Sequence, residues 1–146
     1  MPNWCSNTLR VIGPSDEVKR FKEQAIGYGP WSKVEKQEQN TLNFHSLVPI
    51  PPETLEAGYD DAGFHWERQN WGCKWGACDA TVADEWDGHL VYAFQTAWTP
   101  PVAFLEKLAP QWPRLTFVLD YEEIGMGFKG ITKVVRDSVE DHCIEL

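Results

Sequence analysis

Hydrophobic and polar residues alternate along five stretches of the chain, and this alternation predicts five β-strands. The stretches are residues 3–12, 41–48, 89–98, 115–121 and 128–136. A period of two places one face of each strand toward a core and the other toward solvent. The first stretch is followed by Gly13 and Pro14 and the second by Pro49, where a strand is expected to end. Residues 89–98 are rich in β-forming side chains and are expected to be a central strand.

Apolar residues at helical spacing predict two main helices. The first covers residues 16–26, with Ser15 as its N-cap. The second is capped by Thr99, holds Pro100 and Pro101 in its first turn, where proline is tolerated, and ends at Pro110. Two shorter helical pieces are expected at residues 53–57 and 64–70.

The order of these elements predicts an α+β protein with a ferredoxin-like fold. In this split βαβ arrangement two helices cover one face of an antiparallel sheet. We expect residues 1–146 to form a single domain, because the chain has about the length of one. The regular pattern breaks over about residues 49–87, which we interpret as a Trp-rich insertion between strands 2 and 3. Residues 128–136 would then be an extra C-terminal strand, followed by an acidic tail.

The net charge of the chain limits the kinds of partner that it can bind. The chain carries a formal charge of -9, and residues 49–87 hold nine acidic and two basic residues. A nucleic-acid partner bound through a broad basic face is therefore unlikely on chemical grounds, since that mode neutralises phosphates with Lys and Arg. The N-terminus has no apolar leader, and no apolar run approaches the ~20 residues that span a membrane. These features predict a cytoplasmic protein with reduced thiols.

Four motifs resemble the YubB-like family of plasmid and phage proteins. They are Met1-Pro2-Asn3-Trp4-Cys5-Ser6-Asn7, Asn70-Trp71-Gly72-Cys73-Lys74-Trp75, Phe94-Gln95-Thr96-Ala97-Trp98-Thr99-Pro100-Pro101, and Tyr121-Glu122-Glu123 followed by Phe128-Lys129-Gly130. The resemblance implies a ferredoxin-like domain encoded on mobile elements, with no established enzymatic activity and no catalytic residues to assign. The chain departs from the family pattern at Cys73, where Thr is usual.

The cysteines are candidates for a metal site. Cys73 and Cys78 could bind zinc together with His142 and Cys143, or with Cys5, in a zinc-stabilised module or a metal-dependent enzyme. The alternative is that all four cysteines are packed thiols, which is where free cysteine usually lies. A nucleophilic Cys73 is disfavoured, because the acids around it would raise the pKa of its thiol.

Aromatic residues suggest a second alternative, a module that binds single-stranded nucleic acid. Four-stranded sheets with exposed rings stack unpaired bases, and Tyr92, Phe94 and Trp98 alternate on one face of a predicted strand. Gly127-Phe128-Lys129-Gly130-Ile131 faintly resembles the consensus of such modules, but the leading basic residue and the closely spaced aromatic residues are missing.

The composition of the insertion favours protein binding. Tryptophans are common binding hot spots, and an acidic field speeds encounter with a basic partner. We therefore predict a non-catalytic binding protein that needs no cofactor, recognises a basic protein and could counter host defence by mimicking nucleic acid. The predicted binding residues are Trp66, Trp71, Lys74, Trp75, Asp84, Glu85, Trp86 and Asp87.

Overall fold

A computed structural model describes residues 3–31 and 39–146. The strands are β1 (Trp4–Ile12), β2 (Cys78–Trp86), β3 (His89–Ala97), β4 (Thr116–Glu123), β5 (Phe128–Val135) and β6 (Ser138–Glu145). The helices are α1 (Ser15–Gln24), α2 (Phe44–Leu47), α3 (Pro52–Ala57), α4 (Phe64–Asn70) and α5 (Val102–Leu108), with a π-helical turn at Tyr59–Gly63 and a 3-10 turn at Ala109–Gln111. No helix among the described residues is long and apolar enough to cross a membrane.

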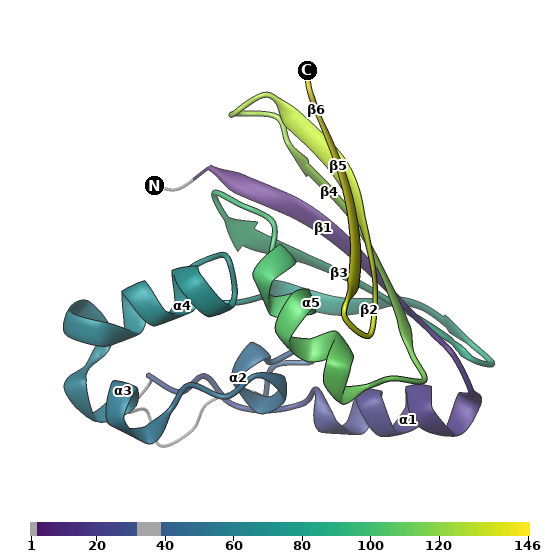
Figure 1. Ribbon diagram of the computed structural model, residues 1–146, viewed down its shortest axis with the longest axis horizontal. Coiled ribbons are helices and arrows are strands. Elements are labelled where there is room, and N and C mark those ends of the chain that lie inside the picture. The colour runs from purple at the N-terminus through teal and green to yellow at the C-terminus, as the bar shows by residue number, and fades with distance from the viewer. Residues whose placement is uncertain (1–2, 32–38) are drawn as a thin grey trace.

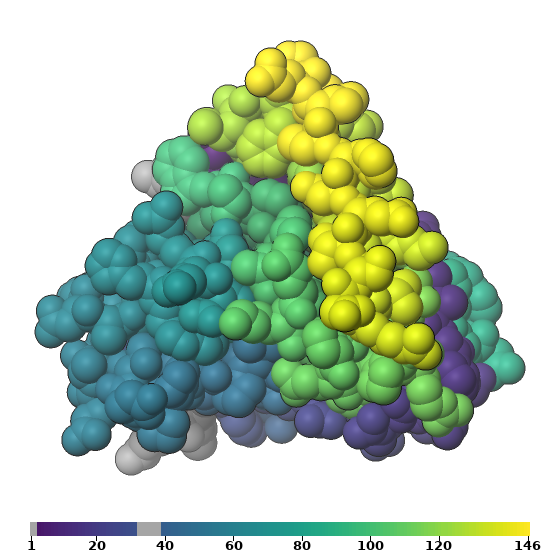
Figure 2. Space-filling view, in the orientation of Figure 1, coloured from purple at the N-terminus to yellow at the C-terminus, as the bar shows by residue number. Residues whose placement is uncertain are grey.

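The six strands form one antiparallel sheet in the order β2-β3-β1-β4-β5-β6. Its first four positions, with α1 after β1 and α5 after β3, are the split βαβ unit of a ferredoxin-like fold. The α+β prediction is therefore confirmed. Figure 1 shows the insertion helices α2, α3 and α4 gathered on one side of α5 and the β5-β6 hairpin on the other. In the same orientation, the surface in Figure 2 is formed by the insertion on the left of the view and by the C-terminal strand on the right.

The core lies between the sheet and the helices. Alternate residues of β1 from Cys5 to Val11 are buried, which confirms the predicted alternation. From α1, the ring of Phe21 contacts Phe117 of β4 at 5.5 Å. Phe104 of α5 stacks on Phe44 of α2 with ring centroids 3.8 Å apart. The same buried cluster therefore joins the sheet, both main helices and the insertion.

The strand predicted over residues 41–48 is wrong, because these residues form α2. The side chain of Asn43 accepts a hydrogen bond from the Ser46 amide at 2.9 Å and so caps the helix. Phe44 and Leu47, three residues apart, then face the core together. The second strand is instead β2, which takes up the last part of the predicted insertion. The insertion, which in the structure comprises α2, α3 and α4, therefore lies between α1 and β2 and not between strands 2 and 3.

Three further predictions need correction. The acidic C-terminal residues form β6, which pairs with β5 along its length. Ser15 is the first residue of α1, and its hydroxyl donates to Asp87 instead of capping the helix. Thr99 does not cap α5, because the helix begins only at Val102, after both prolines, and its N-cap is Pro101. The Thr99 hydroxyl instead donates to the carbonyl of Gly72.

Candidate functional site

Three exposed tryptophans from distant parts of the chain lie at the same end of the sheet. Trp4 begins β1, Trp75 lies in the loop before β2, and Trp98 follows β3. Their exposed fractions are 36%, 46% and 40%. The rings of Trp4 and Trp75 are 6.3 Å apart, and the Trp98 amide donates to the Asn3 carbonyl at 2.8 Å. We call these three residues the tryptophan end.

The loop that carries Trp75 is tied to the β3-α5 connection. The Thr99 hydroxyl donates to the Gly72 carbonyl at 2.5 Å, and the Phe104 amide donates to the Trp71 carbonyl at 3.2 Å. These bonds hold the two chain segments on either side of a small pocket. The geometry of the tryptophan end therefore depends on packing between the insertion and α5.

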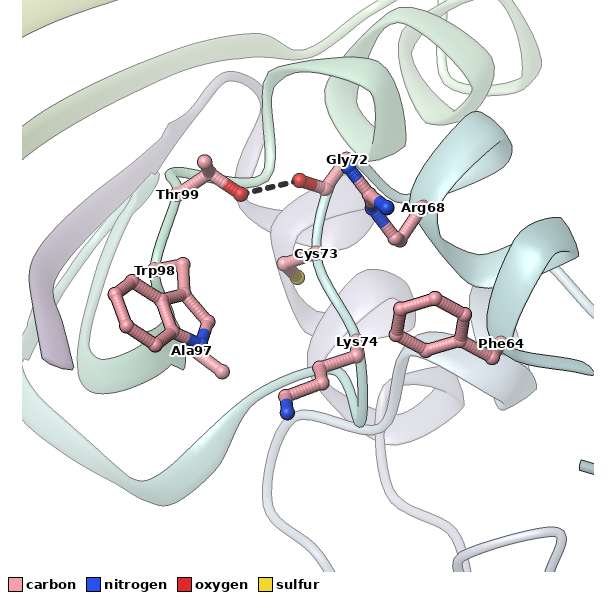
Figure 3. A pocket seen from close by; sticks show the side chains of 8 residues that line it. All are labelled: Phe64, Arg68, Gly72, Cys73, Lys74, Ala97, Trp98 and Thr99. Atoms are coloured by element: carbon pink, nitrogen blue, oxygen red, sulfur yellow. Dashed lines mark hydrogen bonds between the residues drawn. The ribbon is translucent and has the colours of Figure 1, made fainter. Parts of the chain in front are cut away.

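The pocket has a volume of about 320 Å³ and is lined by Phe64, Arg68, Gly72, Cys73, Lys74, Ala97, Trp98 and Thr99. Figure 3 shows Phe64 and Arg68 of α4 on one side, Trp98 on the other, and Lys74 between them. The Lys74 ammonium lies 4.1 Å from the centre of the Trp75 ring, and the Arg68 guanidinium lies 5.4 Å from that of Phe64. Both cations therefore rest on aromatic faces, a contact that holds their positions.

Two of the three tryptophans have a left-handed backbone. The φ angle is 72° at Trp75 and 70° at Trp98. Such a conformation is uncommon for a bulky residue and costs about 1–3 kcal/mol, and it concentrates at functional sites. The fold therefore holds two large rings outward at an energetic cost.

A buried carboxylate supports the strained turn at Trp75. Glu67 of α4 is fully buried, and it accepts hydrogen bonds from the Trp75 amide at 2.5 Å and from the Trp31 indole at 2.7 Å. Burial raises the pKa of Glu67, and these two bonds oppose the shift. Glu67 is thus a positioning residue for the tryptophan end.

Two predicted binding residues pack against the core, Trp71 buried and Trp66 half-buried beside it. Trp71 is 2% exposed, and its indole donates to the Val48 carbonyl at 3.0 Å. The Trp66 ring packs edge-on against Trp71 at 5.6 Å. These two tryptophans anchor the insertion to the core.

The structure divides the other predicted binding residues between the two ends of β2. Lys74 and Trp75 precede its first residue, whereas Trp86 is its last and Asp87 follows. A nine-residue strand separates them by roughly 26 Å at about 3.3 Å per residue. At the far end Trp86 stacks on His89 at 4.0 Å, and Glu85 pairs with Lys22 at 2.7 Å. Exposed Asp84 lies on the same end of the strand.

The cysteines do not converge on the predicted zinc site. Cys78 begins β2 at one edge of the sheet, and His142 and Cys143 lie on β6 at the opposite edge. Within residues 3–31 and 39–146 no three His, Cys, Asp or Glu side chains are placed to hold a metal ion. Burial raises the pKa of the Cys73 thiol, and Glu67 raises it further. Cys73 is therefore poorly suited to act as a nucleophile.

We expect iodoacetamide at pH 8 to alkylate Cys143 in the folded protein long before Cys5 or Cys73. Cys143 is exposed, whereas Cys5 and Cys73 are buried, and burial raises the pKa of Cys5 to about 11. Peptide mapping by mass spectrometry would identify the modified residue, and Cys143→Ser should abolish the fast reaction. Fast alkylation of Cys73 in the folded protein would show that its loop opens.

Two of the three aromatic residues proposed to stack bases, Tyr92 and Phe94, are not available for it. Tyr92 is fully buried and Phe94 is 4% exposed, because both face the helices. Trp98 alone of the three is exposed. The sequence did not single out Trp4, and it placed Trp98 only in the alternative site for stacking bases, not among the residues expected to bind a protein. The available signal was that three of the family-like motifs each contain one of these tryptophans, in Asn3-Trp4, Lys74-Trp75 and Ala97-Trp98.

The fold and the tryptophan end together define a ferredoxin-like α+β protein with an aromatic surface at one end of its sheet. The family described as the ferredoxin-like domain in Api92-like protein matches residues 70–145, so the chain belongs to that family. The crystal structure of the protein Api92 from Yersinia pseudotuberculosis is similar, with a TM-score of 0.76 and 10% sequence identity over 100% of this chain and 98% of that one. No curated protein matches the chain in sequence. The comparisons give no support to the YubB-like assignment.

Proposed function

We propose that this protein is a non-catalytic binding protein that recognises a partner protein through its tryptophan end. The observation that supports this most strongly is the outward placement of Trp4, Trp75 and Trp98 from three separate chain segments. Exposed aromatic clusters of this kind are typical of binding hot spots. The strained backbone at Trp75 and Trp98 agrees with selection for an exposed position.

Charge favours a basic partner. The net charge of -9 creates a field that speeds encounter with a positively charged protein. Asp84 and Asp87, far from the tryptophan end, would contribute to this steering and not to the contact itself. In this proposal the protein acts in the cytoplasm. We further propose a role against a host factor, on the motif resemblance of the sequence alone.

We expect Trp75→Ala to weaken the complex at least 30-fold, because a hot-spot residue contributes about 2 kcal/mol or more. The matched control is Trp86→Ala, since Trp86 has a similar exposed fraction of 49% but lies at the other end of β2. Affinity purification from the host, followed by quantitative mass spectrometry, would identify proteins that the wild type and the control retain. Surface plasmon resonance would then give the affinity of each variant.

The opposite pattern would contradict the proposal. If Trp86→Ala loses the partner and Trp75→Ala keeps it, the contact lies at the acidic end of β2. If neither substitution changes the affinity, neither exposed tryptophan is part of the interface.

A further inference from the structure

A second pocket lies beside the tryptophan end, between the start of β1 and the β4-β5 turn. Its volume is about 230 Å³, and its lining includes Asn3, Trp4, Glu122, Glu123 and Gly125. Trp4 belongs both to this pocket and to the tryptophan end. A partner seated on the tryptophans would therefore reach the pocket as well.

Glu123 is the unusual member of this pocket. It is 1% exposed, and its Oε2 atom has no hydrogen-bond partner among the described residues. A buried polar atom without a partner costs about 1–3 kcal/mol, and more when the group is charged. The ion pairs found in the described part of the chain join Arg20 to Glu17, Lys22 to Glu85 and Arg114 to Asp16, and none of them neutralises Glu123.

The absence of a side chain at Gly125 keeps the pocket open. A Cβ atom at this position would lie 3.0 Å from Glu123 Oε1 and 3.1 Å from Asn3 Oδ1. Two oxygen acceptors therefore converge on the space beside Gly125. Its φ angle is outside the left-handed region, so the backbone itself does not require glycine here.

We infer that this pocket binds a cationic side chain, a guanidinium or primary ammonium, contributed by the partner protein. The inference rests on the proposed function and identifies the chemistry that the partner presents. The carboxylate of Glu123 would accept a charge-assisted hydrogen bond, and Asn3 would supply a second acceptor. Trp4 and Glu122 also line the pocket, but strand alternation places both on the sheet face opposite to Glu123, so the acceptors assigned to the cation are Glu123 and Asn3.

The test uses the whole protein and a short peptide, acetyl-Gly-Arg-Gly-amide. NMR titration of the ¹⁵N-labelled protein should shift the Trp4 indole and Gly125 amide signals. The lysine peptide should produce the same pattern. The citrulline peptide, which matches arginine in shape but is neutral, should not. Equal shifts with arginine and citrulline would overturn the inference, because binding would then not depend on the positive charge.

Two variants, compared with one control, test whether the peptide binds in the pocket at Glu123. Glu123→Gln should weaken arginine-peptide binding at least 10-fold, and Glu140→Gln, which removes one exposed charge from β6, should not. Gly125→Ala keeps every charge and narrows the pocket, so it should also weaken binding. Unchanged affinity in both Glu123→Gln and Gly125→Ala, with folded spectra, would overturn the inference. If the complex with the partner protein still depends on Trp75 in that case, the proposed function stands and only the cation pocket is wrong. If instead the peptide binds as expected but the complex does not depend on Trp75, the cation pocket stands and the proposed function is wrong.

Discussion

Replacing Trp71 by alanine is expected to lower the free energy of unfolding by about 3–5 kcal/mol, the usual range for truncating a large buried aromatic residue. Trp71 is 2% exposed and packs edge-on against Phe44 at 5.6 Å. Its indole donates to the Val48 carbonyl, which the substitution would leave unpaired in a buried site. The backbone carbonyl of Trp71 also accepts from the Phe104 amide of α5, a bond that alanine would keep. One substitution would thus remove packing, a hydrogen bond and part of the support of the tryptophan end.

Urea denaturation followed by circular dichroism would measure this loss. Trp86→Ala is the control, because the same side chain at an exposed position should change stability by about 0.5 kcal/mol or less beyond the loss of its contact with His89. Equal losses in the two variants would show that Trp71 does not anchor the insertion. A change in the slope with urea, and not only in the midpoint, would indicate that the insertion unfolds separately from the sheet.

The strands that could be predicted from the sequence are those with one face buried. In β1, β3, β4 and β5 apolar side chains recur with a period of two because the helices cover that face. The edge strand β2 is mostly exposed along its second half, and every residue of β6 is exposed. Such strands need no apolar alternation, so the acidic sequences of β2 and β6 carried no periodic signal.

The error at α2 has a different cause. The helix is only four residues long, and so short an apolar run fits both a strand and a helix. The Asn43 cap and the stacking of Phe44 on Phe104 favour the helix. The stacking partner is 60 residues away in the sequence, so a tertiary contact decided between two local patterns.

The tryptophan end could be predicted only in part. Trp75 was among the expected binding residues, since the insertion is rich in tryptophan. Trp4 and Trp98 join it through the pairing of β1 with β3, in which Trp4 lies opposite Ala97. The acidic residues near Trp86 were expected on the same surface because they are close to Trp75 in sequence. An extended strand between them separates neighbours in sequence more than a helix or loop would.

Replacing Glu67 by alanine is expected to cost about 3 kcal/mol of stability, because it leaves two buried donors without an acceptor. These donors are the Trp75 amide and the Trp31 indole. Glu67→Gln keeps the shape and one acceptor, so its cost should be smaller. Glu67→Gln also removes the ionisable group, so comparing it with the wild type shows how the ionisation of Glu67 affects stability. Its NMR spectrum should show a displaced Trp75 amide signal if Glu67 holds the strained turn.

The cost of Glu67→Gln should depend on pH in a defined direction. Burial raises the pKa of Glu67 in the folded protein above its ordinary value of 4.5. The folded state therefore holds this proton more tightly than the unfolded state does, and stability falls as the pH rises through that window. The Glu67→Gln variant does not lose stability in this way, because glutamine does not ionise. The deficit of the variant relative to the wild type should accordingly be largest near pH 4 and shrink toward neutral pH, as urea midpoints measured across this range would show. A deficit that grows with pH would mean that the two hydrogen bonds stabilise the charged carboxylate by more than burial penalises it.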